Sequence, residues 1–578
     1  MANGGDKSEL ERLRQLFYPD SIAVVGASRD PRNIGHRYLV HLLEHGYPAE
    51  RIQVVHPSGE EVAGRPAVSS VGELEGAVDL GLILTAGDRV PELLEQLGEH
   101  GVGGVNVFAN DGAVISEPAR LCEIAKRTGT RILGPNSPGY ISVQPDVAAH
   151  ATQMLSTVRL AHGPVGVISH SGAIGGIVGR SMLECGAGFD TLICTGNEID
   201  LELGECLEFL ATERELRAVG LFVETIRDVE SFRRGLRAAR AAGTKVCALK
   251  VGWSEAARRA AAGHTGADAG RVDLFEAELR REGATLCRDL AEMVAMLAVS
   301  SLPAPGPGGL LIGATSGGLT SVLGDTTTAA GLPVPALEGF DNPWDTDIQV
   351  VHEPELTGEE WMRELAREEV AAGVLALSAQ PDRVMAGLAA GMSRSPAGKP
   401  MVVIPYAGLA PEMIAEMPAE AIVWEDAAGA CRALAWALGG AEPPAEEIGS
   451  FEPDPEADRV KAAGIEPNPE AAAGNGAIAV QVTTGRHPTY GAYATVAAPD
   501  GLGPVSVPLP TDAAALKDAL LANPPLAELT RLAGPAPVDS LAAIVVALAD
   551  QDPVRLDPLL LPLDADAAPS AAVKRPAA

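Results

Sequence analysis

The sequence predicts an α/β protein built from three doubly wound parallel-sheet domains, with a small α+β module after them. Short apolar runs alternate with helix-length segments through residues 1–440, which is the pattern of βαβ units in parallel sheets. Segments rich in proline and glycine divide the series, and three of the apolar runs end in a small, hydroxyl-rich turn before a helix. A chain of 578 residues is long enough for several such domains.

The first series occupies residues 1–150 and predicts a domain with five strands. The apolar runs are Ser21–Val25, Ile52–Val55, Leu80–Leu84, Val105–Phe108 and Arg131–Leu133. Helix-length segments such as Arg37–Glu44 and Val90–His100 separate them. The alternation predicts a parallel sheet with helices on both faces.

Two further domains of the same class are expected at residues 151–303 and 304–440. Their strands are expected at Val165–Ile168, Leu192–Cys194, Val219–Val223 and Val246–Leu249, and then at Leu310–Ile312, Val374–Leu377 and Met401–Ile404. Residues 441–475 are rich in proline and glutamate and predict a linker. Residues 476–563 carry the small α+β pattern, and residues 564–578 predict a disordered tail.

The composition argues against several classes of binding partner. A formal net charge of −33 opposes binding to nucleic acid or to an anionic membrane, and no apolar run approaches the length of a membrane span. The N-terminal residues contain no apolar segment of the kind that a secretory signal needs. Seven scattered cysteines without a Cys-x-x-Cys pair predict buried thiols in a reducing cytoplasm, and no metal site is predicted from the spacing of His, Asp and Glu.

The first apolar run ends in a turn that suits a phosphate group. Gly26 closes the strand tightly, Ser28 offers a hydroxyl donor, and Gly35 lets the following helix begin close to the sheet. Backbone N–H groups at such a helix N-terminus bind anions. Ser28 occupies the place of the second glycine of the dinucleotide pattern, so that pattern is absent. A tight turn without a ligand is the equally weighted alternative.

Two later turns repeat this arrangement. Ser169–Gly172 follows the strand at Val165–Ile168, and Thr315–Gly318 follows the strand at Leu310–Ile312. Together, the two helix N-termini could surround one anion. Because Ser, Thr and Gly are ordinary turn residues, two plain βα turns are the alternative.

His264 is the candidate nucleophile and Glu224 its candidate partner. His264 lies in a loop of small residues that follows Lys250, and core packing explains such a histidine poorly. A neutral imidazole is a competent nucleophile near pH 7. Glu224 follows a strand at the carboxyl edge of the sheet, from which a carboxylate could hold the imidazole N–H. A surface histidine and a solvated acid are the alternatives when each residue is considered alone.

The order of these segments resembles that of the NDP-forming acyl-CoA synthetases, a family that includes the ADP-forming acetate–CoA ligases and is related to the succinyl-CoA synthetase α subunit. The resemblance runs from about Phe17 to Gly440. Its most specific part is Lys250–Ser254 with Gly263–Gly266, which is similar to the family's phosphohistidine loop. Further similar segments are Ser169-His-Ser-Gly-Ala173, Gly196-Asn-Glu198, Gly134-Pro-Asn136, Ser316-Gly-Gly318 and Asn342-Pro-Trp-Asp345.

The resemblance implies a Rossmann-like CoA-binding domain followed by two flavodoxin-like ligase domains. His264 would attack an acyl phosphate and become phosphohistidine, with Glu224 orienting it. The residues implied to bind the phosphoryl group are Ser171, Gly172, Ser316, Gly317 and Gly318. The residues implied to bind CoA are Gly26, Ser28, Arg29, Gly35, Pro57 and Asn136. The other expected ligand is a small carboxylic acid or acyl phosphate, and the family implies an oligomer.

The chain departs from the family most clearly near its C-terminus. Ala457–Ile465 resembles the start of an ATP-grasp domain and Gly485–Gly491 resembles its second lobe, so a degenerate remnant without the nucleotide-binding lobe is expected. Leu559 stands where the family has an Asn ligand for Mg²⁺. ATP, ADP and Mg²⁺ are therefore expected only through a separate ATP-grasp subunit of β type. Val55–Pro57 and Val107–Ala113 also differ from the family and would reshape the CoA or acyl pocket.

Three functions are consistent with the sequence. The first is the acyl-CoA-forming subunit of an ADP-forming ligase. The second is an ATP-independent transfer of an acyl group between phosphate and CoA. The third is a non-catalytic module that binds CoA or acyl-CoA, which the loss of the nucleotide-binding lobe favours. The retained His264 and Glu224 favour the two enzymatic functions.

Overall fold

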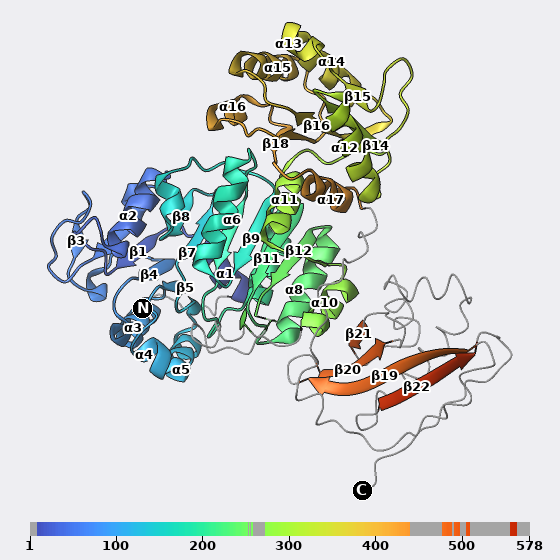
Figure 1. The fold of residues 1–578 in the computed structure, drawn as a ribbon. Helices are drawn as coiled ribbons and strands as arrows, with labels where there is room; N and C mark the ends of the chain where they lie inside the picture. Colours follow the sequence, from blue (N-terminus) through green and yellow to red (C-terminus); the bar gives the residue numbers. More distant parts are fainter. Residues whose placement is uncertain are drawn as a thin grey trace. The chain divides into compact units, whose positions relative to one another are not determined.

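A computed structural model describes residues 8–252, 254, 256–257 and 272–439, and the backbone of four strands beyond them (Figure 1). The chain divides into two compact units. Unit 1 comprises Met1–Glu224, Arg234–Leu249 and Cys287–Pro443, and unit 2 comprises Thr225–Arg233, Lys250–Leu286 and Pro444–Ala578. Among the described residues, no helix combines the length and the apolar character that a membrane crossing requires.

The first sheet is parallel throughout and has the order β3-β2-β1-β4-β5-β6. Its strands are β1 (Ile22–Val25), β2 (Ile52–Val55), β3 (Ala67–Val68), β4 (Leu80–Ile83), β5 (Gly104–Val107) and β6 (Arg131–Leu133). Its helices are α1 (Glu9–Phe17), α2 (Ile34–Glu44), α3 (Val90–Glu99), α4 (Ala113–Ser116) and α5 (Pro118–Thr128). The five predicted strands are confirmed, and β3 is an addition. The strand order reverses at β1, and ligands of such sheets bind at the carboxyl ends beside this reversal.

The second sheet has the order β13-β12-β11-β9-β10-β7-β8. Its strands are β7 (Gly139–Ser142), β8 (Val147–His150), β9 (Val165–Ser169), β10 (Thr191–Cys194), β11 (Ala218–Val223), β12 (Lys245–Lys250) and β13 (Thr285–Leu286). Its helices are α6 (Gly172–Glu184), α7 (Leu203–Glu213), α8 (Val229–Ala242), α10 (Val272–Arg281) and α11 (Leu290–Ser301). Strands β7 and β8 lie within the predicted range 1–150, yet β7 pairs antiparallel with β10 and β8 with β7, so both belong to the second sheet.

The third sheet is parallel and has the order β15-β14-β16-β17-β18. Its strands are β14 (Gly309–Ala314), β15 (Trp344–Asp345), β16 (Val370–Leu377), β17 (Met401–Pro405) and β18 (Ala421–Val423). Its helices are α12 (Gly317–Ala329), α13 (Gln349–His352), α14 (Pro354–Leu365), α15 (Asp382–Arg394), α16 (Pro411–Glu416) and α17 (Ala427–Leu438). The three mostly parallel sheets with interleaved helices confirm the predicted fold class (Figure 1).

A fourth sheet is antiparallel and has the order β21-β20-β19-β22. Its strands are β19 (Ala477–His487), β20 (Gly491–Ala497), β21 (Val505–Pro508) and β22 (Arg555–Pro562). Leu559, which stands where the resemblance implies an Mg²⁺ ligand, lies in β22 opposite Val480. The predicted linker 441–475 and tail 564–578 lie outside the described residues.

Candidate functional site

Three strand ends lie side by side at the carboxyl edge of the second sheet. Strand β9 pairs through Ser169 with Cys194 of β10 on one side and with Phe222 of β11 on the other. The turn after β9, the loop after β10 and Glu224 after β11 therefore leave the sheet together. Because the strand order reverses at β9, this edge is the switch point at which α/β sheets bind ligands.

His170 connects these three strand ends through a buried set of hydrogen bonds. Its Nδ1 accepts the backbone N–H of Glu224 at 2.8 Å, and its Nε2 donates to Glu198 Oε1 at 2.7 Å. The same Glu198 oxygen accepts the N–H of Leu203 at the start of α7, at 2.9 Å. Because a backbone N–H only donates, Nδ1 is unprotonated and Nε2 carries the proton.

The turn Ser169–Gly172 places the start of α6 at this switch point. Ser171 is the N-cap and its Oγ accepts the N–H of Ile174, while its own N–H donates to Ser169 Oγ at 3.1 Å. A side chain on Gly172 would lie 2.2 Å from Pro138 Cγ, so this position needs glycine. The positive end of a 13-residue helix therefore lies where the sequence predicts a phosphoryl site.

Of the two predicted catalytic residues, the structure describes one. Glu224 is half-buried at the end of β11, and its backbone is bonded to the turn that carries Ser171. His264 lies outside the described residues, so its contact with Glu224 stays a prediction. Sequence reasoning assigned no role to His170 or Glu198, although both follow predicted strands within segments that resemble the family.

Two of the segments that resemble the family, Gly134–Asn136 and Gly196–Glu198, lie in stretches that pair with each other along their backbones. The donors Asn197, Ile199 and Leu201 bond to the carbonyls of Pro135 at 2.8 Å, Gly134 at 3.2 Å and Ile132 at 3.2 Å. Gly196 has φ +66°, and a side chain there would lie 2.4 Å from the Pro135 carbonyl oxygen. This ladder joins the end of β6 in the first sheet to the loop after β10 in the second.

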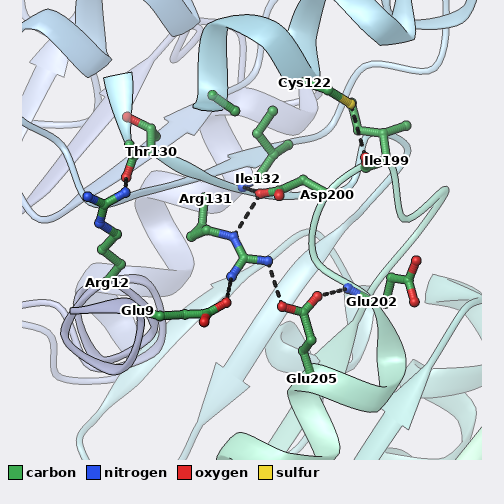
Figure 2. A network of polar contacts seen from close by, with 12 residues as sticks. Glu9, Arg12, Cys122, Thr130, Arg131, Ile132, Ile199, Asp200, Glu202 and Glu205 are labelled. Carbon is green, nitrogen blue, oxygen red and sulfur yellow. Dashed lines mark hydrogen bonds and ion pairs between the residues drawn. The ribbon is translucent and has the colours of Figure 1, made fainter. Parts of the chain in front are cut away.

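Arg131 reinforces the ladder with charge (Figure 2). Its guanidinium contacts Asp200 at 3.0 Å, Glu205 at 2.9 Å and Glu9 at 2.9 Å, and Asp200 also accepts the N–H of Ile132. Burial lowers the pKa of Arg131, but the two carboxylates of Asp200 and Glu205 outweigh this effect and raise it above its usual value. Its side chain is only 13% exposed, so removing the charge would leave carboxylates poorly compensated.

The predicted CoA residues divide between two places in the first sheet. Gly26 has φ +91°, and a side chain on Gly35 would lie 2.6 Å from the Gly26 carbonyl oxygen, so helix α2 starts against the turn. Ser28 Oγ accepts the N–H of Asp30 at 3.1 Å, and Arg29 pairs with Glu60. Pro57 follows β2, the strand beside β1, whereas Asn136 follows β6 at the far edge of the sheet.

Asn136 is part of the ladder between β6 and the loop after β10, and its contact with CoA stays a prediction. It has a left-handed φ of +57°, and its Nδ2 contacts Asn197 Oδ1 at 3.3 Å. The structure therefore brings together Gly26, Ser28, Arg29 and Gly35, places Pro57 on the neighbouring strand end, and places Asn136 nearer the second sheet.

The turn Thr315–Gly318 has the same local form after β14. Ser316 caps α12 through the N–H of Leu319, and Thr315 Oγ1 bonds Ser378 Oγ at 2.9 Å at the end of β16. A side chain on Gly318 would meet nothing within 4 Å. In the part of the chain that the structure describes, no hydrogen bond or ion pair joins this turn to Ser169–Gly172, so their shared anion stays a prediction.

The cysteines are poor candidates for a nucleophile. All are unpaired and six of the seven are buried. Burial raises the pKa of Cys185 and of Cys431 to about 12, so both thiols are protonated near pH 7. Within the described ranges, no three His, Cys, Asp or Glu side chains are arranged to hold a metal ion.

Comparison with known proteins identifies the family. Residues 20–142 match the family model of a CoA binding domain, and residues 162–300 match that of a succinyl-CoA ligase like flavodoxin domain. The α subunit of ADP-forming acetate–CoA ligase II of Pyrococcus furiosus is 36% identical over 335 residues, which are 56% of this chain and 71% of that subunit. The α subunit of ligase I of the same organism is 30% identical over 354 residues, which are 59% and 74% of the two chains.

A solved structure has the same fold. The dinucleotide forming acetyl-coenzyme A synthetase 1 of Ca. Korarchaeum cryptofilum gives a TM-score of 0.63 at 24% identity, over 74% of this chain and 97% of that chain. The matched segments, the two relatives and the shared fold lead to one conclusion. This chain belongs to the family of NDP-forming acyl-CoA synthetases.

Proposed function

We propose that this chain is the acyl-CoA-forming subunit of an ADP-forming acyl-CoA synthetase and that His264 is its phosphohistidine. The observation that carries the proposal is the carboxyl edge of the second sheet, where Glu224 and the helix start at Ser171 share one hydrogen-bonded unit through His170. The segment Gly263–Gly266 supports the role of His264 by its similarity to the family's loop.

The chemistry divides into two displacements. In the direction that breaks the thioester, a phosphate oxygen attacks the acyl carbon, the C–S bond breaks, and CoA leaves as its thiol with the proton from phosphate. An imidazole nitrogen of His264 then attacks the phosphorus of the acyl phosphate, the P–O bond to the acyl group breaks, and the carboxylate leaves. Phosphohistidine remains, and the reverse steps make acyl-CoA.

The chain's own residues would bind and orient the reactants. Charge on the phosphoryl oxygens would be stabilised by the N-terminus of α6 at Ser171 and Gly172, where backbone N–H groups are fixed in advance. Ser316, Gly317 and Gly318 would add a second helix N-terminus. Glu224 would hold the imidazole N–H of His264, and CoA phosphates would lie at the turn after β1.

The proposal includes a second subunit. The two Pyrococcus furiosus relatives are named α subunits, which supports a separate chain that carries the ATP-grasp function. ADP held by that subunit would accept the phosphoryl group, and Mg²⁺ would enter with it. Leu559 at the position of an Mg²⁺ ligand supports the same division of labour.

The test is intact-mass analysis of the full chain after incubation with acetyl-CoA and inorganic phosphate, or with acetyl phosphate alone. We expect a phosphoryl-sized mass increase that acid removes and that His264→Ala abolishes. His352→Ala is the matched control because His352 is an exposed histidine of the third domain, and it should keep the adduct. An adduct that persists in His264→Ala, or CoA binding without any adduct, would contradict the proposal.

A further inference from the structure

The pair His170 and Glu198 is costly to bury, and stability alone explains it poorly. The two side chains are 4% and 3% exposed, and burial of a carboxylate is unfavourable even when it is paired. Glu198 also has a left-handed φ of +51°, which costs a non-glycine residue free energy. Strain and buried polar groups of this kind cluster where a protein must hold a functional geometry.

The hydrogen bonds of the pair form a directed relay. The N-terminus of α7, through the N–H of Leu203, favours a negative charge on Glu198. The Glu198 carboxylate accepts a hydrogen bond from the Nε2–H of His170, which leaves Nδ1 as an acceptor. That acceptor binds the N–H of Glu224. The relay therefore ends on the residue that we propose orients His264.

A second buried histidine shows that burial alone does not produce this arrangement. His150 is 1% exposed and its Nδ1 accepts the backbone N–H of Thr152 at 2.9 Å, much as His170 accepts that of Glu224. Its Nε2, however, lies 3.4 Å from the sulfur of Cys194, which is a weak partner. The distinguishing feature of His170 is the carboxylate that fixes its proton.

We propose that His170 is a positioning residue that holds the Glu224 backbone, and that Glu198 keeps its imidazole in the form that accepts the Glu224 N–H. The inference rests on the proposed function at one point, the role of Glu224 beside His264. Without the bond from His170, the end of β11 is less constrained, and the Glu224 carboxylate occupies its productive orientation less often. Phosphoryl transfer to His264 then slows, while binding of CoA at the first sheet is unchanged.

The experiment compares three variants of the full chain. His170→Leu removes the acceptor, and His170→Asn places an amide oxygen near the position of Nδ1 and so restores it. His150→Leu is the matched control, because it removes a similarly buried histidine whose Nδ1 accepts the backbone N–H of Thr152 rather than that of Glu224. The readouts are the single-turnover rate of phosphohistidine formation against acetyl phosphate concentration, the CoA dissociation constant, and the melting temperature.

We expect His170→Leu to lower the saturating rate by about 100-fold, the size of effect that misplacement of about 1 Å produces, with CoA affinity unchanged. His170→Asn should recover most of the lost rate. His150→Leu should lower the melting temperature to a similar extent and keep the rate. Equal losses of rate in His150→Leu and His170→Leu, or no recovery in His170→Asn, would overturn the proposal.

Backbone amide exchange at Glu224 separates this inference from the proposed function. Exchange should accelerate in His170→Leu, stay near the original rate in His170→Asn, and be unaffected by His150→Leu. If the unmodified chain forms no phosphohistidine, the proposed function fails, and the exchange pattern alone decides the positioning role. Unchanged protection of the Glu224 amide in His170→Leu would overturn the inference whatever the chain catalyses.

Discussion

Two strand-to-helix turns of this chain share a local sequence pattern but differ in their surroundings. Ser169–Gly172 and Thr315–Gly318 each place a serine at the N-cap and a glycine at the first helical position. In the first turn, Gly172 packs against Pro138 and His170 bonds to both neighbouring strand ends. In the second turn, the two glycines are exposed. Local sequence specifies the cap, whereas distant residues decide whether the turn is part of a constrained site.

The largest expected effect is on the free energy of unfolding, and it comes from the ion pairs of Arg131. Arg131→Leu leaves Asp200 and Glu205 without their cation, and we expect a loss of about 3 kcal/mol in the free energy of unfolding. Arg432→Leu is the counterpart near the third sheet, where Glu292 keeps a second partner in Arg288, and it should cost about 1 kcal/mol. Urea unfolding of both variants measures the difference, and equal losses would break the comparison.

The glycines of the two turns provide the next test. Gly172→Ala forces a methyl group against Pro138, and overpacking of this kind costs about 2 kcal/mol. The methyl group of Gly318→Ala enters open space, and alanine has a higher helix propensity than glycine. The free energy of unfolding of this variant should therefore lie within about 0.5 kcal/mol of that of the unmodified chain. Thermal unfolding of the two variants measures the contrast. A loss in Gly318→Ala as large as that in Gly172→Ala would show that the surroundings do not matter.

Acid should weaken the second sheet before the third. Burial lowers the pKa of His150 to about 3. Between about pH 6.5 and pH 3, the His150 side chain therefore stays neutral in the folded chain and binds a proton in the unfolded chain. Stability therefore falls as the pH drops below about 6.5, by about 1.3 kcal/mol between pH 7 and pH 5.5. The one histidine between residues 304 and 440, His352, is exposed.

Hydrogen exchange measured at pH 7 and at pH 5.5 tests this prediction. The lower pH should accelerate amide exchange in β8 more than in β16. His150→Asn keeps an acceptor for the N–H of Thr152 and lacks the titrating ring, so it should show a shallower dependence on pH. An equal response to acid in β8 and β16 would contradict the prediction.

The smallest expected difference is between the two caps. Ser171→Ala and Ser316→Ala each remove one N-cap bond, at 3.4 Å in both turns, and each should cost about 1 kcal/mol. Melting temperatures measured side by side check this near equality. A much larger loss at Ser171 would mean that the cap itself, and not the surrounding contacts, distinguishes the two turns.

Sequence reasoning was most successful where the signal is local. Apolar runs such as Leu80–Leu84 and Met401–Ile404 predicted buried parallel strands, and the small residues after β9 and β14 predicted the two turns. It missed β7 and β8, which are four-residue strands. Strand β8 pairs with β7, and the other partner of β7 is β10, which lies about fifty residues further along the chain. Their pairing depends on tertiary contacts that no local pattern records.

The hydrogen bonds of His170 and Glu198 at the candidate site could also be predicted only in part. His170 and Glu198 each stand in a segment that resembles the family, at the ends of strands predicted to be parallel. Because the carboxyl ends of neighbouring parallel strands lie side by side, the sequence could have indicated that these two residues are close together. The left-handed backbone of Glu198 and its bond to the start of α7 depend on the ladder with Gly134–Asn136, which only the folded structure displays.

The antiparallel pairing of β7 with β10 has a consequence for synthesis on the ribosome. The six strands of the first sheet are complete once Leu133 has emerged, so this sheet can form early. Strands β7 and β8 have to wait for Cys194, the end of β10, before the hairpin gains its place in the second sheet. During that interval the edge of β7 that later pairs with β10 has no strand beside it, and a pause in translation after Cys194 would favour correct pairing over aggregation.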